Sequence, residues 1–366
     1  MSRYDCIVVG AGPAGASAAY HLSQRGHSVL LLEKAALPRY KPCGGGVSPE
    51  IAQWFDFDLS PAISLKANKI RYTWKMEDPV EVDIDTPMWM VRRAEFDDFL
   101  IKQAQNMGAE IRSATEVKGI EFKNSAWQVN TNAEPVTGRY LIAADGAAGP
   151  MAKWLGFKEP KRHLGAVLET ESITGDTLKF DFGTAKKGYI WSFPKAGGYS
   201  ISIATLKGDD PKNLKNILTD YAAASGVDVK NSQVYEHPLC LWDGDRKLHA
   251  QNALLAGETA ALADPLSGEG IRPSIFSGVK AAEAIDKALG GASDALEKYT
   301  QVISEEWGAD MVWASRLAGA FYQFTGVAYK AGVKLPIATQ LMSKILCGEL
   351  RYADIANRAI KRLMPF

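Results

Sequence analysis

A glycine-rich turn between two apolar runs constrains the fold of this chain more than any other feature. Residues 5–33 read DCIVVGAGPAGASAAYHLSQRGHSVLLLE: an apolar run leads into Gly-x-Gly-x-x-Gly, an alanine-rich stretch follows, and a second apolar run ends in an acid. Strand, tight turn, helix, strand and terminal acid in this order are typical of a dinucleotide-binding βαβ unit. The pattern therefore predicts a Rossmann-like domain.

The individual residues of this unit suggest which nucleotide it holds. Gly10 allows the tight turn, Gly12 lets backbone N–H groups approach a pyrophosphate at the helix N-terminus, and Gly15 lets the helix pack closely on the sheet. Glu33 is expected to accept hydrogen bonds from both ribose hydroxyls and to repel a 2′-phosphate. An unphosphorylated ADP-ribosyl group is therefore predicted, and the glycines alone do not separate NAD from FAD. The predicted nucleotide site also includes the neighbouring residues Pro13, Ala14 and Lys34.

Composition excludes several classes of protein. The 42 Lys and Arg residues equal the 42 Asp and Glu residues, which gives no support for nucleic-acid binding. The four cysteines are widely separated, so we predict neither a metal site nor a disulfide framework, and a reducing, cytoplasmic setting. No apolar run approaches the roughly 18 residues of a membrane helix, and the chain enters a strand at once. We therefore expect a soluble or peripheral protein.

The 366 residues exceed what one hydrophobic core usually organises, so we expect two joined domains. Residues 35–49 read as a long, turn-rich loop, and the helix over residues 94–108 should place Phe96, Leu100 and Met107 on one face. The expected class is α/β (α+β overall): a Rossmann-like domain, an inserted antiparallel β-rich domain and a helical C-terminal region. Their expected bounds are residues 1–60, 92–158 and 250–300 for the nucleotide domain, 61–91 and 159–249 for the substrate domain, and 301–366 for the helical region.

Four further motifs follow the βαβ unit. They are YKPCGGG at residues 40–46, VRRAEFD at 91–97, AADG at 143–146, and AGE at 256–258 followed by DPLSGEGI at 264–271. With the βαβ unit, these motifs resemble the geranylgeranyl reductase branch of the FAD-dependent oxidoreductases built like p-hydroxybenzoate hydroxylase. The resemblance covers about residues 4–280 and implies FAD as the cofactor.

The resemblance also implies roles around the flavin. Asp145 and Gly146 would leave backbone amides free for phosphate or ribityl oxygens, unless they form an ordinary strand-ending turn. Gly268 and Gly270 would open a helix whose positive end faces the flavin N1–C2=O edge and favours the anionic reduced form, unless they only end a loop. Arg93 would neutralise the pyrophosphate or brace the loop between domains, with a surface ion pair as the alternative. The same motifs add to the cofactor site Cys43, Gly44, Gly45, Gly257, Glu258, Pro265 and Ile271.

Two motifs suggest the substrate side. Cys43 is placed near the isoalloxazine ring, where its thiol would donate a proton to a carbon centre or shape the cavity as a small apolar residue. Residues 188–194, GYIWSFP, resemble the G-Y-x-W-x-F-P strand of the branch. Tyr189 is therefore the second catalytic candidate, and Tyr189, Trp191 and Phe193 are candidates for an apolar tunnel that holds a polyprenyl chain. Core packing is the alternative for these aromatics.

The sequence of the C-terminal region suggests that it binds a membrane or covers the substrate tunnel. Residues 318–346 are rich in apolar side chains with few charges, and would lie on a bilayer, close the tunnel or pack as an ordinary helical lid. Arg358, Lys361 and Arg362 would favour anionic lipid.

Three positions depart from the branch. Glu258 stands in place of the usual Asp, Ala147-Ala148-Gly149 replaces small polar residues, and Arg272 follows Gly-Glu-Gly-Ile where apolar or aromatic residues are commoner. These departures leave the prediction of FAD unchanged and bear mainly on the substrate.

The leading hypothesis is an FAD-dependent reductase that saturates carbon–carbon double bonds of an isoprenoid or prenyl-lipid substrate. Because isolated alkenes accept hydride poorly, a proton donor near Cys43 or Tyr189 is needed. Only one nucleotide fingerprint is present, so NAD(P)H or a ferredoxin-type donor protein would bind transiently. The alternatives are a hydroxylase (monooxygenase) using NAD(P)H and O2, and a non-redox lipid binder of the same fold. A halogenase is disfavoured because no W-x-W-x-I-P motif occurs.

Overall fold

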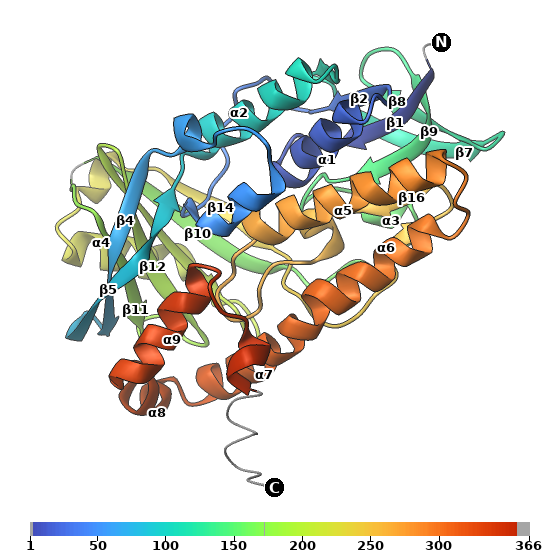
Figure 1. Ribbon diagram of the computed structural model, residues 1–366. Coiled ribbons are helices and arrows are strands. Elements are labelled where there is room, and N and C mark those ends of the chain that lie inside the picture. Colours follow the sequence, from blue (N-terminus) through green and yellow to red (C-terminus); the bar gives the residue numbers. More distant parts are fainter. Residues whose placement is uncertain (1–2, 172, 357–366) are drawn as a thin grey trace, which may run out of the picture.

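Two eight-stranded sheets, here called sheet A and sheet B, organise the chain (Figure 1). The computed structural model describes residues 3–171 and 173–356. The mixed α/β architecture with a Rossmann-like sheet confirms the predicted fold class. The division into domain segments stays a proposal.

Sheet A is built on the N-terminal βαβ unit. The strand order is β15-β16-β9-β1-β2-β6, and all of these neighbours pair in parallel except β15 with β16; β7 and β8 extend the sheet from β9 as an antiparallel pair. Its central strands are buried on both faces, as the apolar runs of Val, Ile and Leu predict. The strands are β1 (Arg3–Val9), β2 (Val29–Leu32), β6 (Glu110–Arg112), β7 (Val117–Lys123), β8 (Ala126–Thr131), β9 (Val136–Ala143), β15 (His249–Ala250) and β16 (Ala253–Leu255).

Three long helices pack together beside sheet A. Helix α1 (Pro13–Gln24) contacts both α2 (Arg93–Asn106) and α5 (Ile271–Leu289), as Figure 1 shows. Phe96 and Leu100 lie on the buried face of α2 as predicted, but Met107 is exposed. The prediction for Met107 is wrong because α2 ends one residue earlier and Met107 enters the turn to Gly108.

Sheet B is antiparallel except for one pair. Its order is β14-β10-β13-β12-β11-β4-β5-β3, and the parallel pair β4–β11 joins a segment before α2 to a segment after β9. A hairpin of two long strands spans residues 65–90. The strands are β3 (Gly46–Val47), β4 (Leu65–Trp74), β5 (Glu77–Met90), β10 (His163–Thr170), β11 (Thr177–Phe182), β12 (Gly188–Lys195), β13 (Gly198–Thr205) and β14 (Val234–Leu239).

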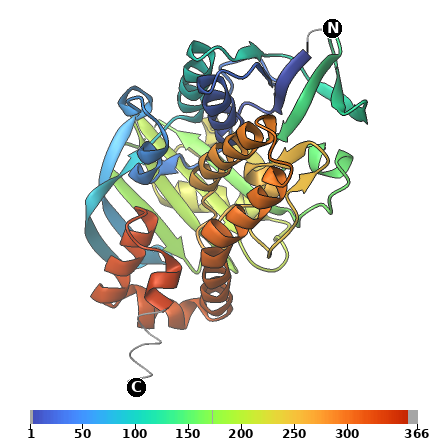
Figure 2. The same cartoon turned by 45° about the vertical axis from the view of Figure 1, so that its right-hand side comes forward.

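The C-terminal part is helical, and α7–α9 lie below sheet B in both views (Figures 1 and 2). The remaining helices are α3 (Met151–Trp154), α4 (Leu214–Ala224), α6 (Ala295–Ile303), α7 (Ala309–Gln323), α8 (Thr325–Ala328) and α9 (Pro336–Leu346). The described residues also contain the π-helical turns η5 (Ser304–Gly308) and η6 (Tyr329–Val333) and the short 3₁₀ turns η1 (Pro49–Trp54), η2 (Ser60–Ala62), η3 (Val229–Asn231) and η4 (Gly257–Ala260). Over the described ranges, none of these helices combines the length and apolar character that crossing a bilayer requires. The basic residues Arg358, Lys361 and Arg362 lie outside the described residues.

Candidate active site

Two adjoining cavities run between sheet A and sheet B. The first, here called the nucleotide groove, follows the carboxyl ends of β1, β2 and β9; the second, the apolar chamber, lies against sheet B. They share Gly12, Lys41, Pro42, Ala144, Gly146 and His237, so one continuous hollow connects them.

Bare backbone forms the end of the nucleotide groove. Gly10 adopts φ +102°, and a Cβ there would lie 2.3 Å from the carbonyl oxygen of Ala144. A Cβ at Gly15 would lie 1.9 Å from the carbonyl oxygen of Gly10, so α1 packs directly on the turn. Helix α1 begins after Gly12 with no side-chain cap, which leaves its first N–H groups for a phosphate. These residues fit the pyrophosphate of FAD.

Glu33 is held at the other side of the groove. Its buried carboxylate accepts hydrogen bonds from the backbone N–H groups of Ala11 (3.0 Å) and Ala35 (3.1 Å). The Arg39 side chain reaches the same carboxylate at 3.3 Å and donates to the carbonyl of Ala11. Lys34 lines the groove beside them. Sequence reasoning missed Arg39, because nothing in the spacing of the loop marks it.

Arg93 is a buried residue and not part of a surface ion pair. Its Nε and Nη2 atoms donate to the two carboxylate oxygens of Asp97, each at 2.8 Å, and Arg39 binds the same carboxylate at 2.9 Å. Burial lowers the pKa of Arg93, but Asp97 and the Cys43 sulfur more than offset this and raise it above its usual value. Arg93 also lines the apolar chamber, where its charge faces Cys43.

The backbone amide of Gly146, which was expected to be free for a phosphate, has an acceptor within the protein. The Gly146 N–H donates to the Thr259 hydroxyl at 2.7 Å, and that hydroxyl donates to Asp145 at 3.0 Å. The expectation of a free amide is therefore wrong for Gly146. Both residues still line the nucleotide groove. The departure from the branch at Gly149 has a steric reason, because a Cβ at this position would lie 1.9 Å from the Asp145 carboxylate.

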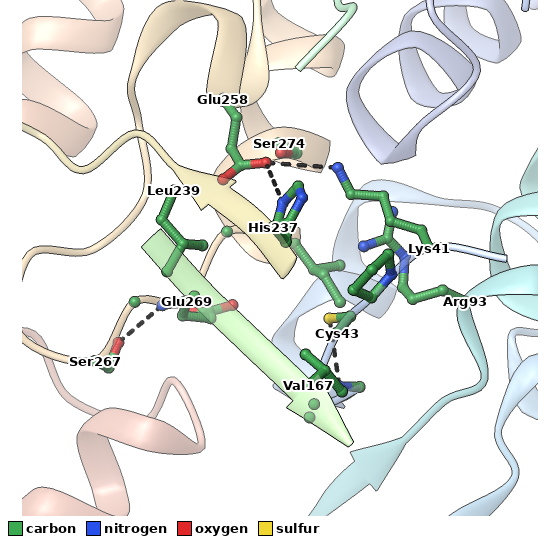
Figure 3. A pocket seen from close by; sticks show the side chains of 18 of the residues that line it. Lys41, Cys43, Arg93, Val167, His237, Leu239, Glu258, Ser267, Glu269 and Ser274 are labelled. Atoms are coloured by element: carbon green, nitrogen blue, oxygen red, sulfur yellow. Dashed lines mark hydrogen bonds and ion pairs between the residues drawn. The ribbon is translucent and has the colours of Figure 1, made fainter. Parts of the chain in front are cut away.

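Glu258 lines the apolar chamber, between two basic side chains that line both cavities (Figure 3). Its carboxylate lies 3.6 Å from Lys41 Nζ and 3.5 Å from His237 Nε2. Burial raises the pKa of Glu258, but Lys41, His237 and Arg93 together lower it to about 2. Lys41 comes from residues 40–46, here called the glycine loop, and His237 comes from β14. Three segments that are distant in the sequence therefore converge at Glu258. Neither Lys41 nor His237 was singled out from the sequence.

The glycine loop lies directly on the aromatic side chains of β12. A Cβ at Gly44 would stand 2.4 Å from Trp191 Nε1 and 3.0 Å from the Phe193 ring. Gly45 adopts φ +78°, and its N–H donates to the Cys43 sulfur at 3.3 Å. The loop therefore presents Cys43 to the chamber, whose apolar wall includes Met88, Leu178, Phe180, Tyr189, Trp191, Phe193 and Leu346.

Tyrosine side chains hold the loop over residues 264–270 at the other side of the chamber. The Tyr189 hydroxyl donates to the carbonyl of Ser267 at 2.5 Å, and Tyr322 donates to the carbonyl of Leu266 at 2.6 Å. Burial raises the pKa of Tyr189. With its proton committed to Ser267, Tyr189 is better placed to position this loop than to protonate a substrate.

The remaining predicted residues divide into two groups. Those that line the apolar chamber are Gly12, Pro13, Ala14, Gly257, Gly268, Gly270 and Ile271. Gly15 and Pro265 line neither cavity. Glu269, which was not singled out, also lines the chamber and accepts the Arg272 N–H at 3.2 Å. Burial raises the pKa of Glu269, and Arg272 only partly opposes this.

Comparisons with known proteins agree with this geometry. A family described as "FAD binding domain" matches residues 3–190. An uncharacterized protein of Methanosarcina barkeri is 32% identical over 295 residues, which cover 79% of this chain and 76% of that protein. A digeranylgeranylglycerophospholipid reductase of Methanococcus vannielii is 27% identical over 329 residues, which cover 81% of this chain and 80% of that enzyme.

Solved structures share the fold. A geranylgeranyl bacteriochlorophyll reductase-like protein of Thermoplasma acidophilum superposes with a TM-score of 0.78 at 24% identity, covering 88% of each chain. A flavin-dependent brominase superposes with a TM-score of 0.73 at 17% identity, covering 100% of each chain. At these identities the likeness concerns the fold, which reductases and halogenases have in common.

Proposed function

This chain belongs to the FAD binding domain family of FAD-dependent oxidoreductases, and we propose that it saturates carbon–carbon double bonds of an isoprenoid chain. The wall of the apolar chamber carries this assignment. Trp191 and Phe193 lie against the glycine loop, Phe180 packs on Phe193, and the chamber adjoins the nucleotide groove. A flexible hydrocarbon would be desolvated there beside the reactive end of the cofactor. The name of the Methanococcus relative points to the same substrate class.

FAD, when bound, would supply the hydride. The residues at the end of the groove would set its position: the uncapped start of α1 would bind the pyrophosphate, and Glu33, which lines the same groove, would bind the ribose. Gly268 and Gly270 line the chamber just before α5 begins at Ile271, so the positive end of α5 faces the same hollow. This orientation favours an anionic cofactor ring.

The substrate must receive a proton as well as a hydride. Cys43 is our candidate donor, through its Sγ atom, because it is only partly buried while the other three cysteines are buried. Glu269 is the second candidate, because it lines the chamber and burial raises its pKa, which favours the protonated carboxyl. The aromatic wall excludes water, which keeps the proton from coming at random from solvent.

The electron donor and the cellular location of the enzyme remain predictions. NAD(P)H or a ferredoxin-type protein would reduce the cofactor in a transient complex. We retain the cytoplasm as the predicted location.

An anaerobic experiment tests the proposal. The FAD-loaded protein is reduced without oxygen, geranylgeranyl diphosphate is added, and flavin absorbance is followed while the product is weighed by mass spectrometry. Reoxidation with a gain of two hydrogens per double bond is expected. Flavin that stays reduced until oxygen is admitted, with an oxygen atom then entering the substrate, would assign a hydroxylase. A protein purified without flavin absorbance that cannot be loaded with FAD would favour the non-redox lipid binder.

Two variants separate the proton donors. Cys43→Ala should slow the anaerobic reoxidation by about 10²- to 10⁴-fold if its thiol is the general acid. Glu269→Gln should have that effect instead if the carboxyl is the donor. Equal, small effects of both changes would show that neither residue supplies the proton.

A further inference from the structure

The most exposed large hydrophobic side chains of residues 3–171 and 173–356 gather on one short segment. They are Ile337 (75% exposed), Val327 (67%), Phe324 (64%) and Leu335 (54%), and elsewhere no large hydrophobic side chain exceeds 45%. All four lie between the end of α7 and the first turn of α9, here called the α8–α9 face. Scattered apolar residues on a surface are ordinary, whereas a cluster marks a binding surface.

Two small polar side chains of α9 face inward. Thr339 and Ser343 are buried, and both donate to backbone carbonyls of the same segment: Thr339 to Val333 at 2.7 Å, and Ser343 to Thr339 at 2.9 Å. Ile337 points to solvent on the opposite side. Gln340 and Lys344 are exposed as well, while Ile345 is buried, so the outer face of α9 carries apolar, polar and basic side chains. A surface helix with such a face can lie at the boundary between lipid head groups and acyl chains.

Within the sequence of this segment, residues 311–348, all charged side chains are positive. No Asp or Glu occurs between Asp310 and Glu349, while Arg316, Lys330, Lys334 and Lys344 do. Lys334 pairs with Asp78 at 2.6 Å; Lys330 and Lys344 have no ion-pair partner in the part of the chain that is described. Exposed apolar side chains on a segment whose charges are all positive match the acyl chains and phosphates of an anionic lipid surface.

Helix α9 also connects this face with the apolar chamber. Leu346, at the end of α9, lines the chamber, and the next residue, Cys347, donates through its sulfur to the Thr86 carbonyl of β5 at 3.2 Å. Leu346 follows Ile337 by nine positions, which is about 14 Å along a helix. A hydrocarbon chain leaving a bilayer at this face would therefore be close to the chamber.

We propose that the α8–α9 face binds the surface of an anionic phospholipid bilayer. The four apolar side chains enter the acyl region, and Arg316, Lys330 and Lys344 lie at the level of the phosphates. A second copy of this chain is the other conceivable occupant, but a two-fold contact would oppose the same cations to one another. Vesicle binding needs no turnover, so it can fail or succeed independently of the proposed reductase activity.

Co-sedimentation of the FAD-loaded protein with vesicles tests the proposal. We expect binding to phosphatidylglycerol vesicles, much weaker binding to phosphatidylcholine vesicles, and loss of the difference at high salt. The double variant Val327→Asp/Ile337→Asp should reduce the affinity for phosphatidylglycerol vesicles at least tenfold. Lys330→Glu/Lys344→Glu should abolish the preference for the anionic lipid.

Met107→Asp is the matched control, because Met107 is also an exposed hydrophobic side chain but lies at the end of α2. It should bind vesicles as the unchanged protein does. Flavin absorbance and thermal unfolding report whether the variants fold. Absence of vesicle binding, or equal binding by the Val327/Ile337 variant, would overturn the proposal. A dimer in light scattering that this variant dissociates would assign the face to self-association instead.

Discussion

Replacing Gly44 by alanine should displace Trp191 and impair catalysis without unfolding the protein. A Cβ at Gly44 lies 2.4 Å from Trp191 Nε1, whereas ordinary contact begins at 3.4 Å, so the indole must withdraw by about 1 Å. Gly44 does not adopt a positive φ, so alanine adds no backbone strain. The Phe193 ring, 3.0 Å from the new Cβ, must give by a few tenths of an ångström. A displacement of about 1 Å near reacting groups can slow a reaction by about 100-fold.

The assay is anaerobic reoxidation of the reduced flavin by geranylgeranyl diphosphate. Overpacking should also cost about 1–3 kcal/mol of stability, which thermal unfolding would register as a small decrease in Tm. Gly119→Ala is the matched control, because no atom lies within 4 Å of a Cβ built there and its φ is not positive. That variant should keep the rate of the unchanged protein.

A double variant makes the prediction sharper. Trp191→Phe removes the Nε1 atom that the new Cβ would strike, so Gly44→Ala/Trp191→Phe should react faster than the product of the two single effects predicts. Strictly multiplicative effects would refute the steric explanation. A Gly44→Ala variant with an unchanged rate would refute the placement of this loop against the reacting atoms.

Three further changes test the polar residues. Asp97→Asn should destabilise the fold by about 3–5 kcal/mol, because it breaks a buried ion pair, whereas Asp98→Asn on the neighbouring, more exposed position should change Tm little. The pKa of Glu258 is lowered to about 2, so its ionisation stabilises the folded state above pH 4.5 by roughly 3 kcal/mol, and this is lost as the pH falls from 4.5 to 2. Glu258→Gln should therefore flatten the pH dependence of unfolding in that window, and an unchanged slope would contradict the assignment. Glu33→Gln should weaken FAD binding about tenfold in a fluorescence titration, since a charge-assisted hydrogen bond to the ribose is lost, while Glu121→Gln should have no effect.

The sequence predicted best what local spacing determines. The turn at Gly10, the start of α1 and the acid at Glu33 depend on residues close together in the chain, and they lie together as expected. The sequence suggested that the glycine loop and Trp191 both lie near the flavin or the substrate, because both motifs resemble one family. It did not predict how closely the loop and the indole approach each other.

Residues that act through distant partners escaped prediction. Lys41 and His237 gain their significance from Glu258, which only the packing of β14 and the glycine loop brings near. The Gly146 amide looked free in sequence because its acceptor, Thr259, comes from a segment more than a hundred residues later. Met107 fitted a helical period but lay one residue beyond the end of the helix, where periodicity gives no warning.

The parallel pair β4–β11 also governs how this protein can be made. One edge of β4 (Leu65–Trp74) stays unpaired until β11 (Thr177–Phe182) has been synthesised. Helices α2 and α3 and strands β6–β9 are synthesised in between. Contacts of such separation slow folding, since a long loop must close before any pairing energy is gained. A chain stalled on the ribosome between these strands would therefore expose the β4–β5 hairpin as an unpaired edge, the state most open to aggregation and to chaperone capture.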